Sequence, residues 1–459
     1  MPFTYESPAN SYKTPGGITI SGVQLFSKSH NKVMPLDGYL TNFTIIESIE
    51  NTSLYFDVTI IDTNGLVERF PIVGEEGIYI KFKTPGNEYN VVEGIFHVYK
   101  VSPRIVDTET ETVGEVYILH CCSRELLNDI SSEVQTSYHN QTYSSIVEKV
   151  FYDYLMKPDD VSKSIVVEPT INSGTFTPCD SSPVSVIKAL AAQSVSKAHP
   201  KVSNYIFHED LRKMYRFRTI ESMMVEEPVE DFYYRRQNIE VKEEDKFNPL
   251  QTIYEYSIDK TFNIIDEYRD GMMYNETITI DILTKQAVLK QFNYFDDKDI
   301  EVLGKNKMIS DISPYKQNAD SPSLSVGFGE IWASGQYNAQ PYFSNVDDNR
   351  VNNPDIAWQT WHKRKASFGL LNTLRIKVKV PGNTNVHAGD LVNLHIPQIE
   401  QLYDRSHRRN NRLYGSRPSF LVISSKHMYE ASSELEYMTE LTCVRNGYAK
   451  NLTTEFENV

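Results

Sequence analysis

The chain has 459 residues and a formal net charge of −15, and 40 % of its residues are hydrophobic and 12 % aromatic. Because domains usually hold about 100 to 200 residues, this length predicts three or four of them, and the apolar content excludes a largely disordered chain. The acidic balance argues against a general nucleic-acid binder, since phosphate neutralisation requires basic surface.

We expect neither membrane insertion nor Sec export. The sequence has no apolar run of about 18 residues, and its start, MPFTYESPANSYK, lacks the apolar core of a signal peptide. Cys121 and Cys122 are adjacent, so a bridge between them would be strained, and Cys179 and Cys443 complete no zinc-binding spacing. Reduced thiols of a protein made in a cytoplasm are therefore expected, and HCC at 120–122 is interpreted as the end of a strand.

After an N-terminal arm at 1–17, residues 18–120 predict a first antiparallel barrel or sandwich. Short alternating runs recur between turn signals: ITISGVQLF, FTIIESI, LYFDVTIID, GIYIKF, GIFHVYKV and VGEVYILHC. Asn64 and Gly65 form a hairpin-type turn signal because both residues tolerate positive φ. Pro71, Gly74 and Glu75 mark a second turn, just before GIYIKF.

Residues 121–225 change character and predict an α/β insertion. RELLNDISSEV and YSSIVEKVFYDYLM place apolar residues at helical spacing. PVSVIKALAAQSVS predicts another helix, with Asp180 or Ser181 as its cap and Pro183 in its first turn. SIVVEP and the pair NYIFHED and KMYRFRTI predict a small sheet, the pair being joined by a short charged turn.

A second barrel is predicted from two separate segments, 226–308 and 354–459. The first contains TIYEYSID and ETITIDILTKQAVLKQFNYF, and the second begins with a helix at 354–372. Its end returns to the pattern of the first barrel, with TLRIKVKVPG, LVNLHIP, SFLVISSKHMY and LEYMTELTCVRNG. Polar residues 309–353 predict an extended loop or a small decorating region. The relation of the two barrels is inferred from strand density, since no repeat of fixed period aligns.

Signs of catalysis are weak. The sequence contains no Walker loop, GxSxG elbow, HExxH helix or GxGxxG turn. The acid pairs at 75–76, 159–160 and 296–297 would suit glycoside hydrolysis, but such pairs in charged loops are usually solvated. His208, Glu209 and Asp210 would suit a metal or acid–base site, yet a charged hairpin turn is favoured. We therefore predict no enzymatic activity, no metal ligand and no cofactor.

Two further groups of residues stand out. Pro381, Gly382, Gly389, Asp390 and Pro397 flank a strand pair, where glycine supplies turn geometry and proline ends the pairing. The loop RSHRRNNR is the one concentrated basic feature of the chain, and it is a candidate for contact with a partner through these four residues: Arg405, Arg408, Arg409 and Arg412.

Residues 43–82, FTIIESIENTSLYFDVTIIDTNGLVERFPIVGEEGIYIKF, resemble the first barrel of the central baseplate hub protein of contractile-tailed bacteriophages, the T-even-like hub family. The matching positions are Glu47-Ser48-Ile49, Ile61-Asp62 and Pro71 through Glu76. NYIFHEDLRKMYRFRTIESM resembles a hairpin of the same family and departs from it at Arg218-Thr219-Ile220.

The closing strands are similar to that family as well. TLRIKVKVPGNTNVHAGDLVNLHIP and FLVISSKHMYEASSELEYMTELTCVRNG carry the following matching pairs and triplets: Val380-Pro381-Gly382, Gly389-Asp390, Ile396-Pro397, Lys426-His427 and Val444-Arg445. The resemblance touches nearly the whole chain, although residues 255–355 match poorly.

This resemblance implies a mainly β, α+β fold with two tube-type antiparallel β-barrels, an α/β insertion and a decorating region. It implies a homotrimer whose six barrels form a pseudo-sixfold ring, joining the sixfold tail tube to the threefold central spike. The implied partners are the central spike protein, tail tube or tube-initiator ring proteins, and surrounding baseplate proteins. Phage DNA would pass through the channel, and the protein would lie in the virion tail baseplate after assembly in the host cytoplasm.

Three other functions are compatible with the sequence. Related hubs occur in contractile injection and type VI secretion machines, which is a nearby possibility. A carbohydrate-binding adhesin would suit the β-rich and Tyr-rich composition, and a glycan hydrolase would require two suitably spaced carboxylates. If the chain lines a channel, its acid excess would discourage DNA from adhering to the wall.

Overall fold

The computed structural model describes most of the chain, with gaps. The described residues are 15–27, 32–70, 72–85, 90–107, 114–156, 163–171, 173–201, 203–234, 249–260, 263, 265, 271–281, 285–294, 296, 303, 306–307, 324–328, 361–371, 374–396, 418–431, 433 and 436–448. Strands dominate them, as predicted, and the largest sheet has 15 strands. None of the helices in these ranges has the length and apolarity needed to span a bilayer.

The first part of this sheet, here named the N-terminal half-sheet, contains eight strands. They are β1 (Thr19–Ser27), β2 (Lys32–Pro35), β3 (Leu40–Ser48), β4 (Tyr55–Asp62), β5 (Glu76–Lys83), β6 (Val91–Val101), β7 (Ile105–Asp107) and β8 (Gly114–Cys122). Antiparallel pairing gives the order β3-β4-β8-β6-β5-β1-β2, with β7 beside β8. A one-turn helix, α1 (Leu66–Arg69), lies between β4 and β5.

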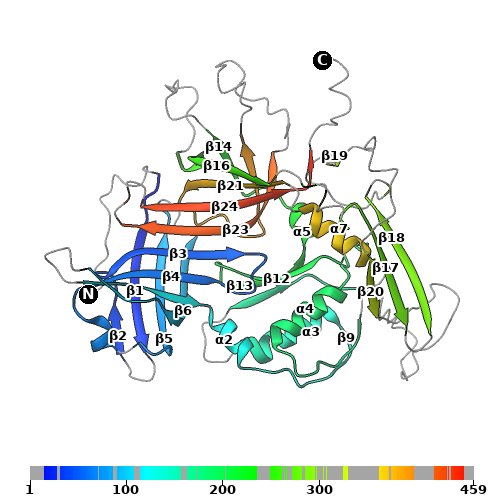
Figure 1. Ribbon diagram of the computed structural model, residues 1–459, viewed down its shortest axis with the longest axis horizontal. Helices are drawn as coiled ribbons and strands as arrows, with labels where there is room; N and C mark the ends of the chain where they lie inside the picture. The colour runs from blue at the N-terminus through cyan, green and yellow to red at the C-terminus, as the bar shows by residue number, and fades with distance from the viewer. Residues whose placement is uncertain are drawn as a thin grey trace, which may run out of the picture.

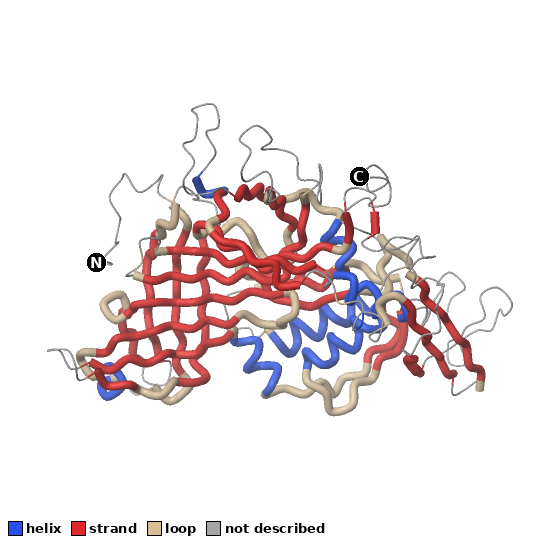
Figure 2. Tube along the Cα trace, turned by 45° about the horizontal axis from the view of Figure 1, so that its top comes forward, coloured by secondary structure: helices blue, strands red, loops and turns tan. Residues whose placement is uncertain are grey.

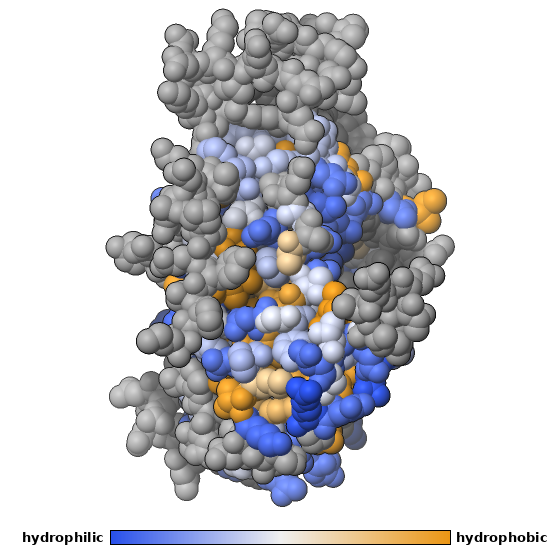
Figure 3. Space-filling model, turned by 90° about the vertical axis from the view of Figure 1, so that its left-hand side faces the viewer, coloured by the Kyte–Doolittle hydropathy of each residue, from blue (hydrophilic) through white to orange (hydrophobic). Residues whose placement is uncertain are grey.

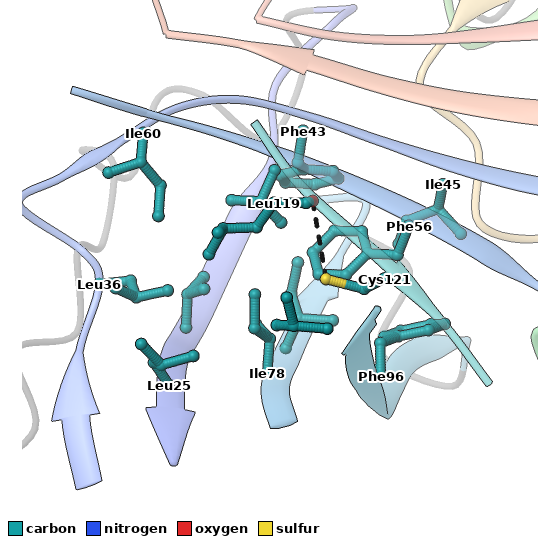
Figure 4. Close-up of a cluster of buried hydrophobic side chains, with 14 of the residues drawn as sticks. Leu25, Leu36, Phe43, Ile45, Phe56, Ile60, Ile78, Phe96, Leu119 and Cys121 are labelled. Atoms are coloured by element: carbon teal, nitrogen blue, oxygen red, sulfur yellow. Dashed lines mark hydrogen bonds between the residues drawn. The ribbon is translucent and has the colours of Figure 1, made fainter. Parts of the chain in front are cut away.

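The alternating residues of these strands meet in one apolar core. Phe43, Phe56 and Phe96 lie within it, with ring centroids of Phe43 and Phe56 6.0 Å apart and those of Phe56 and Phe96 4.9 Å apart. Figure 4 shows side chains from several strands pointing toward one another, with the Cys121 thiol donating to the Leu119 carbonyl at 3.6 Å. Burial of this many apolar side chains is the main force that holds the half-sheet together.

The second part, the C-terminal half-sheet, contains seven strands. They are β14 (Glu230–Tyr234), β15 (Thr252–Ile253), β16 (Glu255–Lys260), β21 (Leu374–Pro381), β22 (Leu391–His395), β23 (Ser419–Glu430) and β24 (Tyr437–Arg445). Their order is β14-β22-β23-β24-β21-β16. β14 and β16 are the two ends of this order. β15 pairs with β14, and the next residue, Tyr254, donates its N–H to the Lys379 carbonyl of β21, so the two ends meet at residues 252–260.

The two half-sheets repeat one pairing scheme. The path β3-β4-β8-β6-β5-β1 corresponds, strand for strand and in chain order, to β16-β21-β24-β23-β22-β14. Even an irregularity recurs: the β6–β8 register shifts between Val98 and Lys100, and the β23–β24 register shifts between Val422 and Ser424. One ladder differs, since β1 and β5 are antiparallel whereas β14 and β22 are parallel.

One ladder joins the half-sheets. Residues 424–430 of β23 pair antiparallel with residues 42–48 of β3, so that the two halves form one continuous sheet. Figure 1 shows β23 and β3 lying side by side at the centre of the molecule. We name this ladder the seam.

An α/β insertion follows the first half-sheet. Its elements are α2 (Arg124–Ile130), β9 (Tyr138–Thr142), α3 (Tyr143–Val150), the π-helical turn η2 (Phe151–Leu155), β10 (Ser164–Val167), β11 (Ser173–Phe176), α4 (Pro183–Gln193), β12 (Tyr205–Asp210), β13 (Met214–Thr219) and α5 (Ile220–Met224). The predicted β12–β13 hairpin is confirmed, with β10 parallel to β13. The predicted cap of α4 is wrong: Ser182, next to Pro183, accepts the Ser185 N–H.

The segment 226–308 departs from its prediction only in part, because β14, β15 and β16 join the large sheet and two later strands do not. Its strands β17 (Tyr274–Asp281) and β18 (Gln286–Asn293) form a separate three-stranded sheet with β20 (Leu324–Phe328), instead of joining the large sheet. The reason is that β17 is paired along both of its edges within this small sheet. Figure 2 shows the helices between it and the large sheet.

Three short elements and one helix complete the described structure. They are η4 (Pro249–Gln251), β19 (Asn306–Lys307), β25 (Gly447–Tyr448) and α7 (Trp361–Leu371). The helix α7 lies within the predicted helical range 354–372 and contacts β17 and β18. The end of the molecule that carries β1 and β2 mixes hydrophilic residues with small hydrophobic areas (Figure 3).

Candidate functional site

The Asn64-Gly65 turn differs from the expected hairpin. Strands β4 and β5, on either side of it, do not pair with each other, and Gly65 has φ 66° at the start of α1. The Asp62 carboxylate accepts the N–H of Asn64 at 3.0 Å and of Leu66 at 2.5 Å. This local acceptor directs the chain into a helical turn, so the hairpin prediction is wrong although the positive φ at Gly65 is found.

The turn before β5 is organised by a buried carboxylate. Glu76 accepts the N–H of Val73 at 3.0 Å, of Gly74 at 2.8 Å and of Glu75 at 3.1 Å through one oxygen, Oε2. Glu76 is fully buried, so the expectation that this acid pair is solvated is wrong for its second member. Gly74 has φ 98°, a conformation that suits glycine. Pro71 lies outside the described residues.

The turn before β22 is built in the same way. The Asp390 carboxylate accepts the N–H of His387, three residues earlier, at 3.0 Å, as Glu76 accepts the N–H of Val73. Gly389 has φ 91°. Glu76 is the first residue of β5 and Asp390 immediately precedes β22, the corresponding strand, so this acid-capped turn is part of the repeated scheme.

The remaining predicted turn residues divide between described and undescribed parts. Pro381 ends β21, and a Cβ added to the next residue, Gly382, would lie 1.8 Å from the ring of Tyr437, so that only glycine fits there. Four arginines and one proline lie outside the described residues: Arg405, Arg408, Arg409, Arg412 and Pro397.

Asp390 also belongs to an ion-pair chain that leads into the insertion. Arg212, in the β12–β13 turn, donates through Nη2 to both oxygens of Asp390, at 2.8 and 3.0 Å. Arg212 Nε lies 3.4 Å from Asp210, and Arg216 Nε donates to the same carboxylate at 2.7 Å. Charge-assisted pairs of this kind are stronger than neutral hydrogen bonds.

Glu47 extends the chain to the seam. Its carboxylate accepts the N–H of Ala388 at 3.0 Å and lies 3.2 Å from Nδ1 of His387. Burial raises the pKa of Glu47, and His387 opposes this shift. We call the following five residues the junction network: Glu47, Asp210, Arg212, His387 and Asp390. It connects β3, the β21–β22 loop and the β12–β13 hairpin.

His208, Glu209 and Asp210 correct the expectation of a charged hairpin turn at these positions. All three lie at the end of β12 and are buried. His208 packs against Gly389, since a Cβ on that glycine would lie 3.5 Å from Nε2, and burial lowers the pKa of His208 to about 3. Helices of the insertion cover one side of β12 and the half-sheets cover the other, so successive side chains are all enclosed.

Glu209 forms a second contact between the insertion and the N-terminal half-sheet. Its carboxylate accepts the Leu54 N–H at 3.1 Å and the Tyr215 hydroxyl at 3.0 Å. Its other oxygen lies 2.6 Å from Lys163 Nζ, which lies 2.6 Å from Glu125 as well. His208, Glu209 and Asp210 are consecutive on β12 and contact different parts of the molecule. The residue pattern of one strand does not predict such contacts.

A cavity of about 430 Å³ lies beside this region, bordered by α4, α7, β12 and the turn after β3. Arg364 lines it and donates to the carbonyl oxygens of Ala191, Ser203 and Tyr205. Burial lowers the pKa of Arg364 to about 10. Glu50 is the one carboxylate among the described lining residues, so these residues do not offer the two carboxylates of a glycosidase.

The geometry of the junction network suits a structural role better than a catalytic one. Its charges face one another and backbone donors, and the described lining of the cavity beside it includes none of its five residues. Across the described ranges, no three His, Cys, Asp or Glu side chains are grouped so as to hold a metal ion. Such a network holds three chain segments in one relative position.

Comparisons with known proteins identify the fold. No protein-family model matches the chain, and no curated protein matches its sequence. The tail protein from Neisseria meningitidis MC58 is similar in structure, with a TM-score of 0.52 and 10 % identity over 94 % of this chain and 97 % of that protein. The 43 kDa tail protein of prophage MuSo2 from Shewanella oneidensis has a TM-score of 0.52 and 10 % identity over 93 % of this chain and 98 % of its own. The chain has the fold of these tail proteins, as its resemblance to a tail hub family indicated.

Proposed function

We propose that this chain is the structural hub of a contractile phage-tail baseplate. Three copies form a ring of six tube-type barrels, one from each half-sheet, and the ring joins the sixfold tail tube to the threefold central spike. Its neighbours are the spike protein, tube or tube-initiator ring proteins and surrounding baseplate proteins, and DNA passes through the central channel.

The observation that carries this proposal is the repeated pairing scheme. A chain that contains the same six-strand path twice, joined edge to edge at the seam, presents two similar units to its surroundings. A threefold assembly of such chains has six similar units, which can face a sixfold partner on one side and a threefold partner on the other. The full-length likeness to two tail proteins supports this interpretation through the fold.

The junction network has a clear purpose in this hub. A ring closes only when the two barrels of each chain meet at a fixed angle, and the network ties β3, the β21–β22 loop and the insertion together through Glu47 and Asp390. Buried ion pairs require good geometry, because a misplaced partner leaves a charge without compensation. The network therefore favours one relative position of the half-sheets.

The test is the mass and symmetry of the purified protein. Light scattering gives the absolute mass, and negative-stain image averaging gives the symmetry. We expect three copies in a ring with a central channel and six similar outer lobes. A protein that stays monomeric at every concentration, and is absent from purified tails of the particle that encodes it, would overturn the proposal.

A further inference from the structure

One edge of the large sheet is exposed where the repeated scheme has it covered. Ile258, on β16, pairs with Ile376 of β21, which pairs in turn with Cys443 of β24. Ile45, on β3, holds the same position in the N-terminal half-sheet, because it pairs with Phe56 of β4, which pairs with Cys121 of β8. Ile45 is fully buried, whereas Ile258 is 47 % exposed.

The two strands also differ at their second edge. The second edge of β3 is covered by β23 at the seam, with His427 directly opposite Ile45. The second edge of β16 has no strand beside it in the described part of the chain, where β16 pairs with β21 alone. An apolar residue on an unpaired strand edge is both a source of unfavourable solvation and a template for a further strand.

The repeated scheme also identifies the strand that corresponds to the seam part of β23 in the N-terminal half-sheet. The N-terminal counterpart of β23 is β6 together with its continuation β7, since the same register shift marks both ladders. Ile105 of β7 pairs with Val116 of β8 as Met428 of β23 pairs with Met438 of β24. Over the described ranges β7 pairs with β8 alone, and Ile105 is 68 % exposed.

We propose that β16 of one copy pairs antiparallel with β7 of a second copy of this chain, repeating between chains the seam that β3 and β23 form within each chain. Thr44 faces Met428 in the seam, so the same register places Ser257 opposite Ile105 of the neighbouring copy. The contact is head-to-tail, with different surfaces on the two copies, and therefore extends into a closed ring when the rotation fits. The strand pairing stands on the repeat, while the closure at three copies rests on the proposed function.

A disulfide between the two facing positions tests the register. In a Cys179→Ser background, which removes the exposed native thiol, Ser257→Cys and Ile105→Cys are combined and the protein is oxidised. Facing residues of antiparallel strands lie within the distance that a disulfide spans. We expect covalent dimers and trimers in denaturing electrophoresis, and no larger species if the ring closes at three.

Matched variants make this result specific. Thr44→Cys with Met428→Cys, the same pair of positions at the seam, should form a disulfide within one chain and leave its mass unchanged. Each single cysteine variant should give no ladder of trimers. An assembled oligomer in which the Ser257 and Ile105 positions do not cross-link would overturn the proposed pairing.

A charge at the exposed edge tests the energetic role of the contact. Ile258→Glu should weaken association at least about tenfold, because a carboxylate would be buried in place of an isoleucine. Leu289→Glu is the control, since Leu289 is 50 % exposed but lies on β18 of the separate small sheet. It should leave association unchanged, and circular dichroism should show both variants folded.

The outcomes separate this inference from the proposed hub function. A threefold ring that persists in Ile258→Glu and gives no cross-link would overturn the strand pairing and leave the hub proposal intact. A cross-linked ladder that runs past three copies into open chains would support the pairing and overturn the trimeric hub. A monomer without cross-links at every concentration would overturn both.

Discussion

The turns that precede β5 and β22 are built alike but surrounded differently. In each, an acidic residue at the start of the strand accepts a backbone N–H from three residues earlier, and a glycine adopts positive φ. Among the described residues, the hydrogen bonds to the Glu76 carboxylate come from its own turn, whereas Asp390 also accepts two hydrogen bonds from Arg212 Nη2. The same kind of carboxylate therefore caps a turn in the N-terminal half-sheet, and in the C-terminal half-sheet it also binds the β12–β13 turn of the insertion through Arg212.

Asp210→Ala is expected to cause the largest loss of stability. Asp210 is fully buried and holds Arg212 and Arg216, so its removal leaves two cations without their shared acceptor and loosens Arg212 from Asp390. Breaking a buried ion pair from one side should lower the free energy of unfolding by about 3 to 5 kcal/mol. Urea unfolding measures this, and a loss below about 1 kcal/mol would mean that the network is not a source of stability.

Acid should act on the turn before β22 more than on the turn before β5. Burial lowers the pKa of His208, which packs against Gly389, to about 3. The unfolded chain therefore binds a proton that the folded chain excludes, and stability is lost as pH falls below about 6.5. At about pH 4.5 this share amounts to roughly 2 to 3 kcal/mol.

The control for the acid effect is His208→Gln, compared with the parent protein by urea unfolding at about pH 7 and about pH 4.5. His427, whose pKa burial also lowers to about 3, keeps its share in both proteins. The raised pKa of Glu47 acts in the opposite direction and is present in both as well. Equal acid losses in the two proteins would contradict the role of His208.

Gly389→Ala and Gly74→Ala compare the two turns directly. Both glycines have positive φ, so each substitution should cost about 1 to 3 kcal/mol of backbone strain. A Cβ at Gly389 would also meet Met223, His208 and Ile49 at 3.4 to 3.7 Å, whereas at Gly74 the contact within range is one carbonyl at 3.9 Å. All of these distances are ordinary van der Waals contacts, so thermal unfolding should show similar losses for the two variants, and a much larger loss at either site would contradict backbone strain as the common cause.

The smallest effect is expected from an exposed ion pair on the same half-sheet. Lys379 of β21 lies 2.7 Å from Glu255 of β16, and both side chains are substantially exposed. Lys379→Ala should change the free energy of unfolding by less than about 1 kcal/mol, because solvent screens such pairs. A larger loss in urea unfolding would show that position in the sheet, rather than burial, decides the value of a charge pair.

The sequence by itself determined the local elements of this protein. Period-two alternation located strands such as β4 and β23, helical spacing located α3 and α4, and the glycines at 65, 74 and 389 indicated turns that require positive φ. These features depend on side chains within a few residues of one another, which a local pattern records. The error at the cap of α4 is of the same local kind, because Ser182 and its neighbours all offer suitable acceptors.

Only the tertiary structure decided which elements meet. The seam joins residues more than 370 positions apart, β17 pairs with β20 instead of the large sheet, and three charged or polar residues of β12 are buried because two other regions cover it. Ile45 and Ile258 occupy equivalent positions in similar strands, yet one is buried and the other exposed. The strand pattern is similar in both cases, but among the described residues another strand lies along the far edge of β3 and none along that of β16, which a local pattern does not record.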